Sequence, residues 1–345
     1  MGKRSRAFRL GASVLCVSSW MLGAVPGSVQ HPITLAGSGS SLAAHLLGVW
    51  GRKFHDQHPA IEVGYIATSS SEGITEVGRL AGDFAIGEMP LTEKQRNNPS
   101  GPLAQIPVAV FSIVPVYKLP GRLQIRFTGE LLGQIYMGHI TNWRDQRIVH
   151  LNPDAVLPDL PITLLQRPEG TGSRYVFTEF LAKTGPQFGK WMQTVHHESP
   201  REVMVARSKG VVDRLAVTPG AIGFIEYGIA VEFGLQYGQV QNASGKFVAP
   251  SPQSIDAASA AMQELVLSDS RGPLLNAPGE NSYPLTSFAW VYVNALLPSE
   301  RRSDLFEFLN WCLGEGQNLI PGQGHDRLPR AVATKAQVRL SSLLR

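Results

Sequence analysis

The sequence predicts an α/β fold, because three short apolar segments are each followed by a turn of small residues and then by an amphipathic helical pattern. The three apolar segments begin at Ile33, Ile61 and Ile162. Further apolar runs alternate with helical patterns along the rest of the chain. Open α/β sheets bind their ligands just beyond the carboxyl ends of their strands. We therefore expect the three small-residue turns to form the functional part of the molecule.

Residues 1–27 predict a secretory signal peptide. They contain four basic residues and no acidic residue, and an apolar run extends from Leu10 to Val25. This run is shorter than the roughly 18 to 20 residues of a membrane-spanning helix, so we expect cleavage rather than a retained anchor. Cys16 lies within the apolar run and does not follow a small residue, so a lipid anchor is not expected. No later segment is long and apolar enough to predict a membrane span.

The mature chain is expected to be electrically neutral, because removal of the four basic residues of the leader cancels the net charge of +4. A neutral protein offers no general attraction for nucleic acid or for acidic membrane surfaces, so neither is expected as a partner. Loss of Cys16 leaves Cys312 without a partner for a disulfide. The fold must therefore depend on its hydrophobic core.

The first turn, residues 37–41, follows a predicted strand at Ile33–Ala36 and places Ser41 at a helix start. The helical face is formed by Leu42, Leu46, Val49, Trp50 and Phe54. The glycine pattern lacks the third glycine of a dinucleotide-binding turn and the lysine of a P-loop, so both nucleotide interpretations are discounted.

The second turn, residues 68–73, lies between a predicted strand (61–65) and a helical pattern at residues 74–80. A serine in such a turn is often only a helix cap, and this alternative remains open. A short strand at residues 83–88 then ends in Glu88. Glu88 is either a residue of the ligand-binding edge or a solvated loop charge.

The third turn combines a cation with a helix start. A buried strand at residues 162–165 leads to Arg167, and the small residues 170–173 precede a helical pattern. Backbone N–H groups, the hydroxyls of Thr171 and Ser173 and the guanidinium of Arg167 would hold a small oxyanion. An ordinary capped helix is the alternative.

The remaining elements complete the alternation of strands and helices. The apolar stretch Ile106 to Val116 is interpreted as a strand that passes from one domain to the other, and residues 182–207 as irregular. Other expected strands are residues 220–225 and 288–293, and other expected helices begin near Thr128, Ile255 and Leu305.

The sequence favours binding over catalysis. It has no H-E-x-x-H, paired cysteines or clustered histidines, so no metal or cofactor is expected. It also lacks G-x-S-x-G, and no serine of the turns is next to a histidine or lysine base, although spatial neighbours cannot be judged from sequence.

The chain resembles the periplasmic phosphate-binding proteins of bacterial phosphate ABC transporters. The resemblance runs from about Ile33 to Leu328 and depends on motifs at residues 37–42, 63–65, 83–84, 89–92, 138–143, 167–177, 219–227 and 283–288. It implies a two-lobed, type II-like fold with two crossover segments and the ligand in the cleft between the lobes. The implied lobes are 33–113 with 286–345, and 114–285.

The resemblance also implies the ligand-binding residues, which are Ser41, the N–H of Leu42, Ser70, Glu88, Arg167, Thr171, Gly172 and Ser173, with Glu169 orienting Arg167. The chain has Glu at positions 88 and 169, where the family has Asp, and Leu42 replaces a phenylalanine. Each longer acid adds a methylene group to a tight site, so the selectivity of the site is left open.

The implied function is that of a secreted, non-enzymatic binding protein that captures inorganic phosphate in the periplasm for the permease subunits of an ABC importer. Two alternatives remain at this stage. One is a binding protein for another tetrahedral oxyanion such as arsenate, and the other is a secreted phosphatase or hydrolase that uses one of the turn serines.

Overall fold

The computed structural model describes residues 33–99, 101–193, 201–263, 275–320 and 325–344. The expected leader at residues 1–27 lies outside the described residues. None of the helices in the described ranges has the length and apolarity that crossing a membrane requires.

One sheet contains the strands that precede all three turns. Its order is β2-β1-β3-β12-β4-β8-β6-β7, and β9 pairs with β4 outside this path. The strands of its first part are β1 (Ile33–Ser40), β2 (Ile61–Thr68), β3 (Phe84–Gly87), β4 (Leu103–Tyr117) and β12 (Thr286–Asn294). The strands of its second part are β6 (Thr163–Gln166), β7 (Glu202–Met204), β8 (Ala221–Glu226) and β9 (Gln236–Tyr237). Another sheet has the order β11-β10-β5 and consists of β5 (Arg126–Phe127), β10 (Gln239–Gln241) and β11 (Phe247–Val248).

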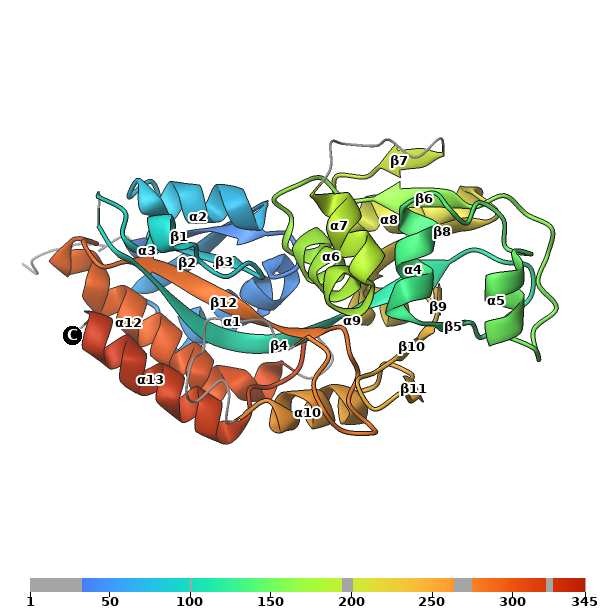
Figure 1. The fold of residues 1–345 in the computed structure, drawn as a ribbon. Coiled ribbons are helices and arrows are strands. Elements are labelled where there is room, and N and C mark those ends of the chain that lie inside the picture. Colours follow the sequence, from blue (N-terminus) through green and yellow to red (C-terminus); the bar gives the residue numbers. More distant parts are fainter. Residues whose placement is uncertain (1–32, 100, 194–200, 264–274, 321–324, 345) are drawn as a thin grey trace, which may run out of the picture. The chain divides into compact units, whose positions relative to one another are not determined.

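Helices alternate with these strands along the chain. Those before β6 are α1 (Ala44–Gln57), α2 (Ser70–Gly78), α3 (Glu93–Arg96), α4 (Gly129–Tyr136) and α5 (Gln146–Leu151). Those that follow β6 are α6 (Gly172–Thr184), α7 (Pro186–Met192), α8 (Ser208–Val217), α9 (Tyr227–Glu232), α10 (Pro252–Ala261), α12 (Ser299–Leu313), the 3-10 helix η1 (Glu315–Leu319) and α13 (Arg330–Leu344). In Figure 1, α12 and α13 lie side by side, and they also contact each other.

Parallel pairing brings the carboxyl ends of the site strands together. β1 is parallel to both β2 and β3, and β6 is parallel to both β7 and β8. Residues that directly follow β1 and β3 therefore meet at one edge, as do residues that follow β6 and β8. β12 is antiparallel to β3 and β4, so the sheet as a whole is mixed.

The long strand β4 belongs to both parts of the sheet. It pairs with β12 as far as Ser112 and with β8 from Ile113 onward (Figure 1). The change of partner lies close to the predicted lobe boundary at residue 113. The register with β12 shifts between Ala289 and Trp290, opposite Pro107, which has no N–H to donate to the ladder. Every residue of β4 is buried, so the strand forms the centre of the fold.

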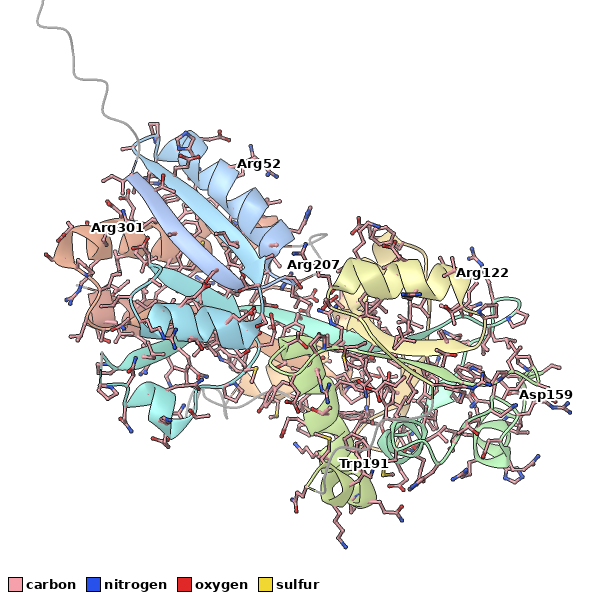
Figure 2. The ribbon with its side chains drawn as sticks, turned by 90° about the horizontal axis from the view of Figure 1, so that it is seen from above. Arg52, Arg122, Asp159, Trp191, Arg207 and Arg301 are labelled. Carbon is pink, nitrogen blue, oxygen red and sulfur yellow. The ribbon has the colours of Figure 1, made fainter. Side chains whose placement is uncertain are left out.

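An ion pair fixes one helix to the first part of the sheet. Asp83 precedes β3 and accepts a hydrogen bond from the backbone N–H of Ala36 at 2.7 Å. Its other oxygen, Oδ1, accepts one from Nε of Arg301 at 2.9 Å, and Arg301 is labelled on α12 in Figure 2. Asp83 therefore has a structural role and is separate from the acid Glu88 five residues later.

The expectation of irregular structure across residues 182–207 is wrong in part. Helix α7 begins with Pro186, and strand β7 pairs with β6. Phe188 of α7 is buried, and Trp191 and Val203 also pack against the core, so apolar contacts stabilise this segment despite its largely polar pattern. Residues 194–200 of this stretch lie outside the described ranges.

Candidate functional site

Glu88 is a fully buried acid that follows β3. Its Oε2 accepts a hydrogen bond from the hydroxyl of Ser70 at 2.9 Å, and the same hydroxyl accepts one from the Glu88 backbone N–H at 3.4 Å. Ser69, rather than Ser70, caps α2 by accepting from the backbone N–H of Glu72 at 3.2 Å. Ser70 is therefore free from helix capping, and its hydroxyl is bound to the carboxylate of Glu88.

The pKa of Glu88 is raised from an ordinary 4.5 to about 7, mainly because burial disfavours the charged form. Hydrogen bonds from Ser40 and Ser70 lower the pKa, whereas the charge of Glu226 raises it. A carboxyl group with a pKa near neutrality is able to accept a hydrogen bond from a ligand hydroxyl once it has lost its own proton.

The raised pKa of Glu88 predicts that the unliganded protein loses stability as the pH rises. Between these two pKa values the folded protein binds more protons at Glu88 than the unfolded chain does. The stabilisation that Glu88 provides is therefore fully present below pH 4.5 and is lost as the pH rises through about 7. The loss should be on the order of 3 kcal/mol for a shift of this size. Urea unfolding at a pH of about 5 and about 8 measures it, and Glu88→Gln should reduce the fall.

The pKa values of Glu226 and Asp326 are also raised, so these acids change the stability with pH in the same direction. Both acids are present in the native protein and in Glu88→Gln, so their contributions cancel when the two proteins are compared. An equal loss of stability in the native protein and in Glu88→Gln would contradict the prediction.

The first turn differs from its predicted geometry. Strand β1 continues to Ser40, which pairs with Thr68 of β2, and α1 begins only at Ala44. The expectation that Ser41 marks the helix start is therefore wrong, because extended pairing with β2 holds the chain in the strand for longer. The backbone N–H of Leu42 donates to the Ser40 hydroxyl at 3.3 Å, and Ser40 is also the serine that hydrogen-bonds Glu88. Ser41 and Leu42 line an adjoining cavity.

Arg167 follows β6 and is only 3% exposed. Its Nη1 donates to the hydroxyl of Ser208 at 3.3 Å, and its backbone carbonyl accepts from Nη1 of Arg174 at 2.8 Å. Burial lowers the pKa of Arg167, while the charges of Glu226 and Glu88 raise it. A guanidinium group does not lose its proton in a protein, so Arg167 is a buried cation close to two acids.

Glu226 is a site residue that sequence reasoning missed. It is the last residue of β8, the parallel neighbour of β6, and is 3% exposed. Burial raises its pKa, and the charge of Arg167 and a hydrogen bond from Ser208 lower it. The rule that singled out Glu88, an acid at the end of a buried strand, would also have identified Glu226. Ser208, at the first position of α8, has no comparable sequence signal.

Glu169 does not lie where the resemblance implied. It is exposed, in a turn where the next residue, Gly170, has a φ of 79°. The acids that act electrostatically on Arg167 are Glu226 and Glu88. The physical reason is that Glu169 belongs to a surface turn, where water solvates its carboxylate, whereas a buried strand supplies Glu226.

The N-terminus of α6 has no side-chain cap. Thr171 is the N-cap residue, but its hydroxyl donates to the carbonyl of Pro168 at 2.8 Å and makes no capping hydrogen bond. The first turn of α6 contains no acidic residue, and Gly172 and Ser173 are buried there. N–H groups without a side-chain cap and the positive end of the helix dipole favour an anion at this position.

The structure brings the two predicted halves of the site together. A Cβ atom added to Gly172 would lie 1.8 Å from Oε2 of Glu88, so the acid after β3 and the start of α6 are in contact. Nearby, the backbone N–H of Ser71 donates to the carbonyl of Gly170 at 3.2 Å.

Three buried atoms of this site have no hydrogen-bond partner among the described residues: Oε1 of Glu88, Nε of Arg167 and Oε2 of Glu226. Buried polar atoms are almost always paired, so unpaired atoms need an explanation. One donor and two acceptors at the end of an uncapped helix match an oxyanion that itself carries a proton. Within the ranges that the structure describes, no group of three or more His, Cys, Asp or Glu residues is arranged to hold a metal ion.

A family model described as a PBP superfamily domain matches residues 26–315 of the chain. The chain belongs to this family. Among relatives of this PBP-like chain, the phosphate-binding protein PstS of Xylella fastidiosa (strain Temecula1) is 28% identical over 298 residues, covering 83% of this chain and 79% of the relative. The phosphate-binding protein PstS of Pasteurella multocida is 28% identical and covers 89% of both chains.

Solved structures of similar fold include a putative phosphate ABC transporter substrate-binding protein from Clostridium perfringens with bound phosphate. Its TM-score is 0.63 at 17% identity, covering 86% of this chain and 100% of that chain. An ABC-type phosphate transport receptor from Vibrio cholerae gives a TM-score of 0.58 at 21% identity, covering 86% and 100%. The resemblance inferred from the sequence and the predicted α/β, two-lobed fold are confirmed, while the lobe boundaries and the ligand-binding residues remain predictions.

Proposed function

We propose that this protein is a secreted, non-enzymatic binding protein that captures inorganic phosphate in the periplasm and delivers it to the permease subunits of an ABC importer. The observation that carries the proposal is the cluster of Glu88, Arg167 and the start of α6, whose buried polar atoms lack partners. The names of the PstS relatives, which cover most of the chain, also support it.

Each group of the site would have a distinct role toward phosphate. Arg167 would neutralise charge and donate hydrogen bonds to phosphate oxygens. The N–H groups of Gly172 and Ser173 would bind another oxygen at the helix start. The hydroxyls of Ser41, Ser70 and Thr171, one on each of the three turns, would bind further phosphate oxygens. The carboxylate of Glu88 would accept a hydrogen bond from a phosphate hydroxyl, which is the feature that separates phosphate from fully ionised anions.

Isothermal titration of the purified protein with phosphate, sulfate and arsenate tests the proposal. We expect binding of phosphate and much weaker binding of sulfate. Tighter binding of sulfate, or binding of neither anion, would overturn it. Arsenate has the geometry and protonation of phosphate, so its affinity measures how far the longer acid Glu88 changes the fit. An enzyme would reveal itself by turnover of p-nitrophenyl phosphate, which we do not expect.

The side chain of Glu88 is expected to determine the choice between phosphate and sulfate. Glu88→Gln replaces a charged acceptor by an amide that donates hydrogen bonds, which removes the repulsion of sulfate and one acceptor for phosphate. The ratio of the two dissociation constants should shift toward sulfate by roughly thirtyfold, or about 2 kcal/mol. Titration with both anions measures the ratio.

The matched control for this prediction is Glu169→Gln, because Glu169 is exposed. We expect this variant to keep the native ratio. If the ratio of the phosphate and sulfate dissociation constants stays unchanged in Glu88→Gln, Glu88 does not determine selectivity.

A further inference from the structure

A cavity of about 380 Å³ adjoins the candidate site. It shares Ser41, Leu42 and Glu226 with the surroundings of the anion cluster, and Ile229 and Asp326 also line it. Its volume lies within the range of roughly 300 to 1,000 Å³ that is typical of sites for small organic molecules. A single phosphate group is far smaller, so the cavity leaves room for a substituent on the phosphorus atom.

Three acids line the cavity, Glu226, Glu232 and Asp326, together with His45, His325 and apolar side chains such as Ile229 and Val231. Oε2 of Glu226 is buried and has no hydrogen-bond partner among the described residues. Asp326 is partly buried, and burial, with the charge of Asp256, raises its pKa to about 7. Neither Glu226 nor Asp326 forms an ion pair within 4.0 Å with any residue that the structure describes. Asp326 faces no cation in the described part of the chain, whereas Glu226 already faces the charge of Arg167. These two acids, beside apolar side chains, are suited to an ammonium group on a short alkyl chain.

The backbone fixes the position of Asp326. Its N–H donates to the carbonyl of Val110 at 2.7 Å, and its carbonyl accepts from the Val110 N–H at 2.8 Å. Val110 lies in the buried strand β4, so Asp326 is held by the centre of the sheet. The acid is therefore part of a preformed wall.

The cavity is present although the two halves of the anion site already touch. The hydrogen bond from Ser71 to Gly170 and the contact of Gly172 with Glu88 both exist in the structure that contains the cavity. The cavity therefore persists beside these contacts, and its lining comes from both predicted lobes.

We propose that this site also binds phosphorus oxyanions that carry a short cationic substituent, such as aminoalkylphosphonates. The phosphoryl group would lie at Arg167 and Glu88, and the ammonium group would lie in the cavity between Glu226 and Asp326. The inference rests on the proposed function, because it uses the same site for the phosphoryl group.

Isothermal titration with 2-aminoethylphosphonate, ethylphosphonate and inorganic phosphate tests the inference. The two phosphonates have nearly the same size and differ in the amine. A pH of about 8 lies above the pKa of about 7 for Asp326, so this acid is ionised. We expect 2-aminoethylphosphonate to bind at least about tenfold more tightly than ethylphosphonate.

Two variants outside the anion cluster locate the effect. Asp326→Asn should bring the two phosphonates to nearly equal affinity, and Ile229→Trp should fill the cavity and weaken both, while phosphate binding stays unchanged. Asp159→Asn is the matched control at an exposed position labelled in Figure 2, and it should have no effect.

The outcomes separate the two proposals. Binding of phosphate without 2-aminoethylphosphonate, equal binding of the two phosphonates, or no effect of Asp326→Asn would overturn the inference and leave the proposed function intact. Binding of 2-aminoethylphosphonate without phosphate would overturn the proposed function and support the inference. Binding of no phosphorus oxyanion would overturn both.

Discussion

Arg167→Met is expected to weaken phosphate binding by roughly a hundredfold, or about 3 kcal/mol. The guanidinium is the cation that acts electrostatically on both Glu88 and Glu226, and it is almost completely buried. Its loss would leave two acids facing an incoming anion without compensation. Methionine keeps a long unbranched side chain, so the substitution removes charge and hydrogen bonds with little change of volume.

The matched control for this variant is Arg144→Met, because Arg144 is exposed. Titration with phosphate should give the native dissociation constant for the control. Arg167→Lys adds a second comparison, since lysine restores the charge but not the fork of donors, and it should recover only part of the affinity. Native affinity in Arg167→Met would exclude this residue from the binding site.

Gly172→Ala is the second substitution with a large expected effect. The new Cβ would lie 1.8 Å from Oε2 of Glu88 and 2.7 Å from its Cβ, distances that require one of the two residues to move. Moving either residue separates the acid from the helix start. We expect phosphate binding to fall by about a hundredfold, and the overpacking to cost roughly 1 to 3 kcal/mol of stability. Titration and urea unfolding measure the two effects.

Gly189→Ala in α7 is a suitable control, because the nearest atom to its Cβ would be 3.5 Å away. The double variant Glu88→Asp with Gly172→Ala tests the cause directly. Aspartate shortens the acid by one methylene group and withdraws the oxygen that clashes, so it should recover part of the lost stability. A fully stable Gly172→Ala that binds phosphate normally would contradict the close contact.

The sequence predicted the local architecture of all three turns, and the structure confirms a strand, a turn and a helix at each of them. Period and turn chemistry are local properties, so they can be read from a short window of residues. The exact helix start after β1 was not predictable in this way, because pairing of Ser40 with Thr68 in another strand decides it.

The charge relations of the site could be predicted only in part. Arg167 and Glu88 stood out because each follows an apolar strand. The choice of Glu226 over Glu169 as the acid close to Arg167 depends on β8 lying beside β6, a long-range pairing that the neighbouring residues do not encode. The helix α13 was missed although buried residues recur at four-residue spacing from Val332 to Leu344. That pattern was a usable signal.

The position of β12 constrains the order in which the chain can assemble. This strand lies between β3 and β4 in the sheet, yet it begins at Thr286, long after both of them in the chain. The first part of the sheet therefore stays incomplete until most of the polypeptide has been synthesised, and contacts between such distant residues form slowly. A chain that is late to close its central sheet remains extended for longer after synthesis begins. Such a delay would suit the export that we propose for this protein, because a chain crosses a membrane before it folds.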